Sequence, residues 1–186
     1  MAGSLIKIDE FSISSAVASV ILGGGSSGSS GLNVSIDSTY DVYMLKFFNV
    51  LGTSGNNNLE MRVTESGTPN TTSNYDWVAK KLDATTSFGN QNVQNLDHFY
   101  LNIQVGNDTS DGEQNNGIAY IFNANNSSEY TFYTQETVYL NPFSGGLNGA
   151  QGGGVFTSAS AVDGLNIFFS TGNIDSGTFT LYALKK

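Results

Sequence analysis

The sequence predicts an all-β fold, a two-sheet antiparallel β-sandwich of jelly-roll type. Short segments of alternating apolar and polar residues recur roughly every dozen residues, and clusters of Gly, Ser, Asn and Pro separate them. No window carries a sustained apolar stripe at helical spacing. The uneven lengths of the segments and loops favour a sandwich over a closed up-and-down barrel.

The first half of the chain supplies the first of these segments. Residues 5–22 alternate imperfectly, which indicates two short strands or one bent strand. Residues 40–50 are dense in aromatic and branched side chains and predict a central strand buried on both faces. Asn56, Asn57 and Asn58 then turn the chain, so we expect residues 59–64 to pair with 40–50 as a hairpin. Two further segments are residues 32–36 and, as a strand or a helical turn, residues 74–82.

The second half of the chain continues the pattern to its last residues. Thr178, Thr180 and Tyr182 alternate with Phe179, Leu181 and Ala183, which is the period-two pattern of a closing strand. The other predicted strands here are residues 99–105, 118–122, 130–140, 155–160 and 165–169.

Two glycine-rich segments interrupt the strands. Residues 23–31 read as a solvated loop, with contact to a neighbouring subunit as the alternative. Residues 145–154 lack the Lys-Ser/Thr ending of a phosphate-binding loop. We interpret the second segment either as a mobile loop or as a place where another backbone comes close at a subunit interface.

Composition limits the functions open to the chain. Its 186 residues suit a single sandwich domain spanning 1–186, and the lack of cysteine excludes disulfides and thiolate sites. The net charge of −9 makes nucleic acid an unfavourable partner, because phosphate binding depends on Lys and Arg. Neither a secretion signal nor an apolar run long enough to span a membrane is expected.

One acidic turn could bind calcium. Asp108, Asp111 and Glu113 gather around Gly112, and calcium prefers several oxygen ligands in a flexible turn. The spacing differs from an EF-hand loop, so a solvated turn is the competing interpretation. Asp37 and Asp41 could also be ligands, although aspartates more often cap turns.

The sequence gives no sign of catalysis. His98 is the single histidine and precedes a predicted strand, and no nucleophile-elbow motif is present. Acidic residues are numerous, but no spacing singles out a pair suited to glycoside hydrolysis. We therefore expect a protein that is not an enzyme, with His98 as a strand-end residue that makes one hydrogen bond.

Aromatic residues offer a different chemistry. An exposed aromatic ring can stack on a sugar ring while nearby Asn and Asp bind its hydroxyl groups. Trp77, the single tryptophan, follows a turn together with Tyr75. These two residues are the first candidates for a glycan-binding surface.

Five motifs in order resemble those of a known family. They are the serine-rich stretch 14–20, Tyr-Asp-Val-Tyr-Met-Leu at 40–45, Leu-Glu-Met-Arg-Val at 59–63, Ser-Asn-Tyr at 73–75 and Ser-Gly-Thr-Phe-Thr-Leu-Tyr at 176–182. Together they resemble the small β-sandwich virion structural proteins of tailed bacteriophages, including marine phages. Ala183 stands where that family would have glycine.

The resemblance implies a non-catalytic virion protein without cofactor. It implies a capsid-surface decoration or cement subunit, assembled in the host cytoplasm, that forms a homotrimer and contacts the major capsid protein. A tail-fibre or tail-tip knob subunit, or a carbohydrate-binding module for host-surface recognition, is the alternative.

Overall fold

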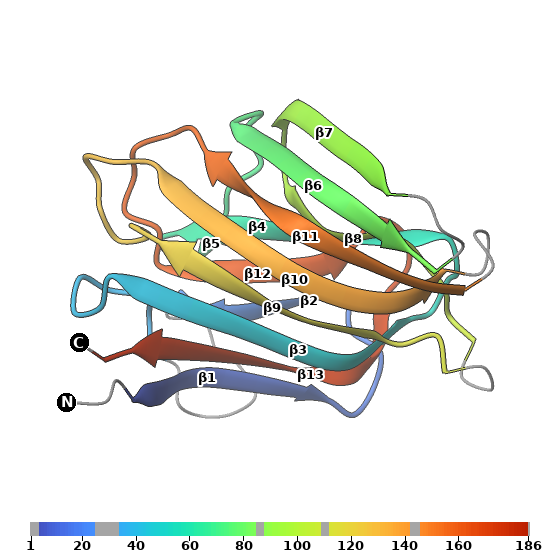
Figure 1. Ribbon diagram of the computed structural model, residues 1–186. Helices are drawn as coiled ribbons and strands as arrows, with labels where there is room; N and C mark the ends of the chain where they lie inside the picture. Colours follow the sequence, from blue (N-terminus) through green and yellow to red (C-terminus); the bar gives the residue numbers. More distant parts are fainter. Residues whose placement is uncertain (1–3, 25–33, 85–87, 109–111, 142–145, 186) are drawn as a thin grey trace.

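The computed structural model describes residues 4–24, 34–84, 88–108, 112–141 and 146–185. In these residues the fold consists of thirteen β-strands in two antiparallel sheets, which lie one on the other as the layers of a sandwich (Figure 1). The predicted all-β sandwich is therefore confirmed.

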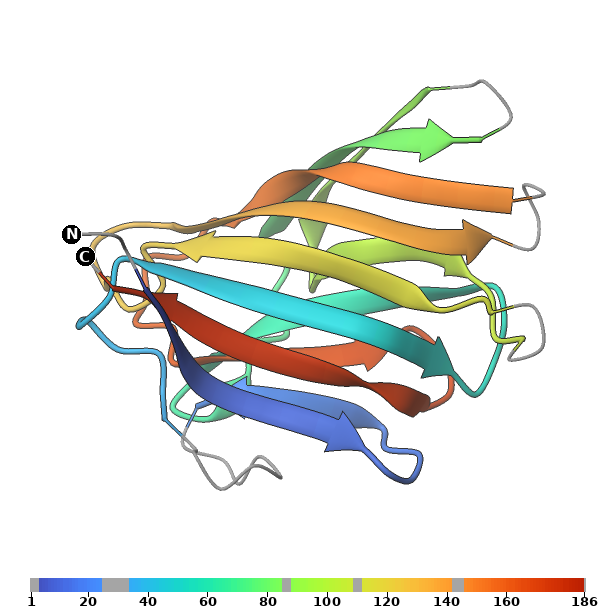
Figure 2. The ribbon, with the colours of Figure 1, turned by 60° about the horizontal axis from the view of Figure 1, so that its bottom comes forward.

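The larger sheet has eight strands and forms one broad layer, seen most clearly in Figure 2. In spatial order it contains β1 (Leu5–Ile13), β13 (Ile174–Leu184), β3 (Val42–Gly52), β9 (Asn115–Phe122), β10 (Thr131–Asn141), β11 (Gly146–Phe156), β6 (Tyr75–Asp83) and β7 (Gly89–Leu96).

The smaller sheet covers one side of the larger. It contains β2 (Ser19–Gly23), β12 (Gly164–Phe169), β4 (Asn57–Glu65), β5 (Thr68–Pro69) and β8 (Phe99–Val105), and both β5 and β8 pair with β4. Ser66 and Gly67 join β4 to β5 with positive φ angles of 52° and 74°, a tight turn of the kind that joins adjacent strands.

Eight of the strands follow jelly-roll order. The larger sheet holds the run β1-β13-β3-β9, and the smaller sheet holds β2-β12-β4-β8. The chain crosses between sheets from β1 to β2, β3 to β4, β8 to β9 and β12 to β13, as a jelly roll requires. The other strands of the larger sheet, β6, β7, β10 and β11, extend it beyond the jelly roll, and we call these four the extension.

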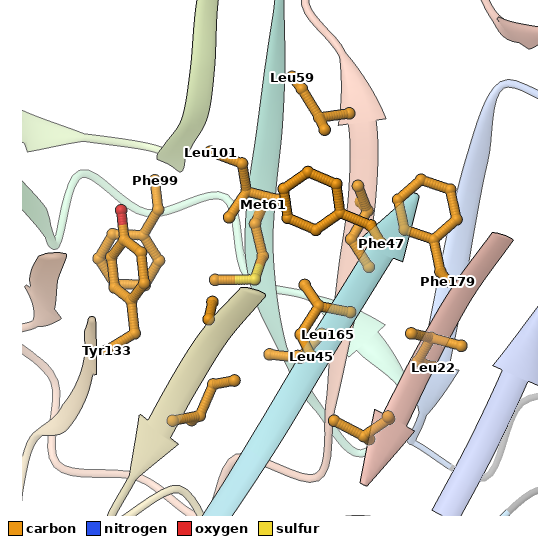
Figure 3. Packing of buried hydrophobic residues seen from close by; sticks show 14 of the residues in the cluster. Leu22, Leu45, Phe47, Leu59, Met61, Phe99, Leu101, Tyr133, Leu165 and Phe179 are labelled. Atoms are coloured by element: carbon orange, nitrogen blue, oxygen red, sulfur yellow. The ribbon is translucent and has the colours of Figure 1, made fainter. Parts of the chain in front are cut away.

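Apolar side chains from both sheets meet in one core. Leu45, Phe47 and Phe179 of the larger sheet face the side chains of Leu22, Leu59, Met61 and Leu165 from the smaller one (Figure 3). Burial of each such side chain stabilises the fold by about 1.5–3 kcal/mol. Under the extension, Phe99 of β8 packs on Tyr133 with ring centroids 4.4 Å apart, so β8 closes this part of the core.

Two predictions about the central strands are wrong. Residues 40–50 and 59–64 do not form a hairpin, because β3 lies in the larger sheet and β4 in the smaller. The turn at the asparagines does reverse the chain direction, but the chain passes there from the larger sheet to the smaller one. β3 is also not buried on both faces throughout, since Lys46 and Phe48 are exposed on the face where Met44 is buried.

The second glycine-rich segment is also not a loop. Residues 146–154 belong to β11, which pairs with β10 on one side and β6 on the other. A Cβ atom on Gly152, Gly153 or Gly154 would overlap a backbone carbonyl oxygen of these neighbouring strands. The close backbone approach predicted for a subunit interface therefore occurs inside the sheet.

The remaining differences lie at the polar segments and at the chain start. β7 is rich in Asn and Gln and was not predicted as a strand. Residues 5–22 form two strands, β1 and β2, in different sheets. Residues 34–36 are irregular, and most of the predicted loop at 23–31 lies outside the described residues.

Candidate functional site

The side of the larger sheet turned away from the smaller sheet, which we call the outer face, is rich in apolar side chains. Strand register assigns to it Phe48 on β3, Phe132 and Val138 on β10, Leu147 on β11 and Val78 on β6, all between 37 and 60% exposed. Other apolar side chains on the same side are Leu5, Val42, Met44, Leu82, Ile118, Tyr120, Phe122, Leu140, Val155, Tyr182 and Leu184. Exposed apolar area concentrated on one face is typical of an interaction surface.

The outer face is also indented. A hollow of about 470 Å³ lies between Val78, Val93, Phe132 and Val155, and a second of about 380 Å³ lies beside Phe48, Ile118 and Val138. Gly149 and Gly153 of β11 add no side chain to this face, so the larger residues on β10 and β6 stand above them. A partner surface with protruding side chains could fit into these hollows.

Charges on the outer face are balanced. Lys7, Lys46 and Lys80 share it with Glu10, Asp76 and Glu136. The whole chain, in contrast, has 7 basic and 16 acidic residues. Most of the net negative charge therefore lies elsewhere, and this face repels a neighbouring acidic molecule least.

A second candidate site lies at one end of the sandwich. Val42 pairs with Phe122, so the residues before β3 and after β9 are brought together. They line a cavity of about 330 Å³, which we call the end cavity. Its lining residues are Asp37, Ser38, Tyr40, Asp41, Asn123, Ala124, Asn125 and Asn126.

Hydrogen bonds hold the two walls of the end cavity in place. On one wall, the Tyr43 hydroxyl accepts from the Asp37 N–H and donates to the Asp37 carbonyl oxygen, both at 2.9 Å. On the other, the Asn125 side-chain amide donates to the carbonyl oxygens of Ile36 and Val162 at 3.3 and 3.2 Å. Asn125 thus ties the two walls to each other and to the segment before β12.

A third cluster lies on the smaller sheet. His98 Nδ1 is 2.6 Å from Asp97 Oδ1, and His98 Nε2 is 3.4 Å from Glu60 Oε1. Burial raises the pKa of Glu60 to about 7 and lowers the pKa of His98, despite the opposing effect of Asp97 on the histidine. Arg62 pairs with Asp97 at 2.5 Å and lies over the Phe168 ring. These contacts fasten β4 to the turn before β8.

The structure corrects the glycan-binding prediction at Trp77 and Tyr75. Both side chains point into the core, with 1% and 0% exposure, so neither ring can present a face to a sugar. Trp77 packs edge-on against Tyr100, and Tyr75 packs against Phe99 and Phe156. A turn precedes these residues, but strand alternation places both on the inner face of β6.

The calcium prediction stays a prediction. The Asp108 N–H donates to Glu113 Oε2 at 2.8 Å, and the Glu113 N–H donates to the Asp108 carbonyl oxygen at 3.1 Å. Asp111 lies outside the described residues. Within the described part of the chain, no three His, Cys, Asp or Glu side chains are placed to hold a metal together.

Asp37 has the turn-capping role expected for it. Its Oδ1 accepts from the Thr39 N–H at 2.8 Å and lies 3.3 Å from the Tyr43 hydroxyl. Asp37 and Asp41 also line the end cavity, opposite asparagines more than eighty residues away in sequence. Sequence reasoning missed this juxtaposition because only the pairing of β3 with β9 creates it.

No protein-family model matches the chain, and comparison with curated proteins and with solved structures found no match. The described residues include no helix suited to crossing a membrane.

Proposed function

We propose that this chain is a non-enzymatic structural protein of a phage virion, and that it acts as a decoration or cement subunit on the capsid surface. The observation that carries the proposal is the outer face, which combines apolar side chains with balanced charge. The resemblance of the five sequence motifs to phage virion proteins supplies the biological setting.

The size of the outer face suits this role. Eight strands spaced about 4.8 Å apart, each about nine residues long at 3.3 Å per residue, cover roughly 1,000 Å². A stable interface needs about 800 Å² from each partner. One face is therefore large enough for a lasting contact with a neighbouring subunit.

Adhesion would be the mechanism. Copies of the chain, assembled as homotrimers, would bury the outer face against each other and against the major capsid protein. Many such contacts on one particle add up through multivalency, even where each contact is weak. The acidic remainder of the surface would face solvent and keep assembled particles apart.

Copy number per particle tests the proposal. Quantitative mass spectrometry of purified virions gives the ratio of this chain to the major capsid protein. We expect a ratio near that of a shell component. A ratio like that of tail components would favour a tail-fibre or tail-tip subunit instead, and absence from purified virions would refute the structural role.

A further inference from the structure

We propose that the end cavity binds a neutral saccharide. The cavity is formed by loops at the end of the sandwich and not by the outer face, so the proposal is independent of the adhesive role. Its volume of about 330 Å³ is at the small end of the range for ligand sites, which suits a short carbohydrate and not a large ligand.

The lining supplies the groups that sugar hydroxyls need. Asp37 and Asp41 offer carboxylate acceptors, and Asn123 offers both an amide donor and a carbonyl acceptor. The hydroxyl of Ser38 can donate or accept. The lining therefore contains both donors and acceptors for sugar hydroxyls.

Tyr40 supplies the aromatic surface. Its ring is half-buried at the cavity and meets the ring of Tyr43 edge-on, with centroids 6.0 Å apart and an interplanar angle of 84°. Tyr43 is itself buried, so the Tyr40 ring rests on a packed neighbour. An aromatic ring that already packs against a neighbour loses less side-chain entropy when it contacts the C–H groups of a sugar.

The walls are organised before any ligand arrives. The bonds from Tyr43 to Asp37 and from Asn125 to Ile36 and Val162 fix both loops. The Val162 N–H also donates to the Ala124 carbonyl oxygen at 2.8 Å. Binding to such a cavity costs little conformational entropy.

Charge and hydrogen bonding select the ligand class. Among the described residues that line the cavity, none is Lys or Arg, so the two carboxylates disfavour phosphates and acidic sugars. Calcium is disfavoured because it prefers several carboxylate ligands, and among the described residues no third acidic side chain joins Asp37 and Asp41 at a metal-binding position. A neutral polyhydroxylated ligand fits what remains.

Nuclear magnetic resonance titration tests the proposal. D-Glucose, D-galactose, D-mannose and N-acetyl-D-glucosamine would each be titrated into the ¹⁵N-labelled full chain, with calcium chloride as a separate titrant. We expect at least one sugar to give saturable shifts at the backbone amides of residues 37–41 and 123–126. Asp41→Asn should weaken that binding about tenfold or more, since a hydrogen bond to a charged group contributes about 1.5–3 kcal/mol.

Matched variants separate binding from folding. Asp175→Asn removes the same charge at an exposed position near the start of β13 and should leave the affinity unchanged. Asn123 has a φ angle of 57°, so Asn123→Gly keeps the backbone conformation while removing the side chain, and it should weaken binding. The proposal is overturned if none of the four sugars gives shifts, if the shifts lie away from the cavity, if Asp41→Asn and Asp175→Asn behave alike, or if only calcium binds there.

Discussion

At the scale of single residues, the Glu60 and His98 pair links stability to pH. Both residues are buried, and burial favours the uncharged form of each side chain. Folding raises the pKa of Glu60 from 4.5 to about 7. The contribution of Glu60 to the free energy of unfolding is therefore complete below pH 4.5 and is lost as pH rises through 7. For His98, with its lowered pKa, stability is lost in the opposite direction, as pH falls.

Glu60→Gln should remove the Glu60 part of this dependence. Relative to the unchanged protein, the variant should gain stability as pH rises from 4.5 to 7, by a difference on the order of 3 kcal/mol. Urea unfolding followed by Trp77 fluorescence at several pH values measures it. Glu129→Gln at an exposed position serves as the control. A difference between Glu60→Gln and the unchanged protein that stays constant with pH would contradict the assignment.

Trp77 makes a second residue-scale prediction, which tests its burial. Trp77→Ala should lower the free energy of unfolding by about 3–5 kcal/mol, because it leaves a cavity beside Tyr100. Val78→Ala, at the adjacent position but 60% exposed on the outer face, should change it by less than about 0.5 kcal/mol. Chemical unfolding followed by circular dichroism compares the two, and equal losses would show that Trp77 is not a core residue.

At the scale of elements, β11 depends on its glycines. A Cβ atom on Gly153 would overlap the carbonyl oxygen of Tyr133 on β10. Gly153→Ala should therefore destabilise the fold by about 3 kcal/mol, since the two strands must move apart. Gly89→Ala on β7 is the matched control, because its Cβ would lie an ordinary 3.6 Å from Lys81 and should cost little. Thermal unfolding of both variants decides whether the close approach exists.

The strands found from the sequence are those whose faces differ. β13 alternates the buried Phe179, Leu181 and Ala183 with Thr178, Thr180 and Tyr182, so its period-two pattern was visible in the sequence. β11 has five glycines and β7 is mostly Asn and Gln, so neither sequence shows the alternation of apolar and polar residues that predicts a strand. β7 and β11 each pair with the strand that precedes them, but β11 also pairs with β6, which lies far away in sequence.

The candidate sites were harder to find than the strands for a related reason. The turn before Trp77 suggested that its side chain would be exposed. Trp77 lies two residues after the buried Tyr75 on β6, however, so both side chains point to the same, inner face of the sheet. The outer face is assembled from strands that are individually unremarkable in sequence. Only the register between them shows that their exposed apolar residues adjoin.

At the scale of the whole molecule, the outer face should control self-association. Val138→Glu places a charge among its apolar residues, whereas Val34→Glu does so at a similarly exposed position outside the sheets, the two valines being 43 and 45% exposed. We expect the first variant to weaken association of copies about a hundredfold, since an unpaired charge at a buried interface costs about 3 kcal/mol. The second should leave association unchanged.

Analytical ultracentrifugation over a range of concentrations measures this difference. The unchanged protein should sediment as a trimer and Val138→Glu as a monomer at the same concentration, with circular dichroism showing that both are folded. If the unchanged protein stays monomeric at every concentration, the outer face binds a different virion protein and not another copy of this chain. If the two Glu variants behave alike, the outer face does not mediate association of copies.

The strand β7 ends the larger sheet, and among the described strands none pairs with its free side. Its eight residues include no charged residue and no proline, the features by which sheet edges usually resist pairing with other chains. The opposite edge, β1, has three charged residues, Lys7, Asp9 and Glu10, while the strand pairing at both edges contains a register shift. The two edges of the larger sheet therefore differ. The β1 edge resists pairing with another chain, whereas the β7 edge exposes backbone amides and carbonyls that a further strand could pair with. Copies that pair edge to edge can therefore do so only through β7, and such pairing stops at a dimer of sheets instead of growing into a polymer.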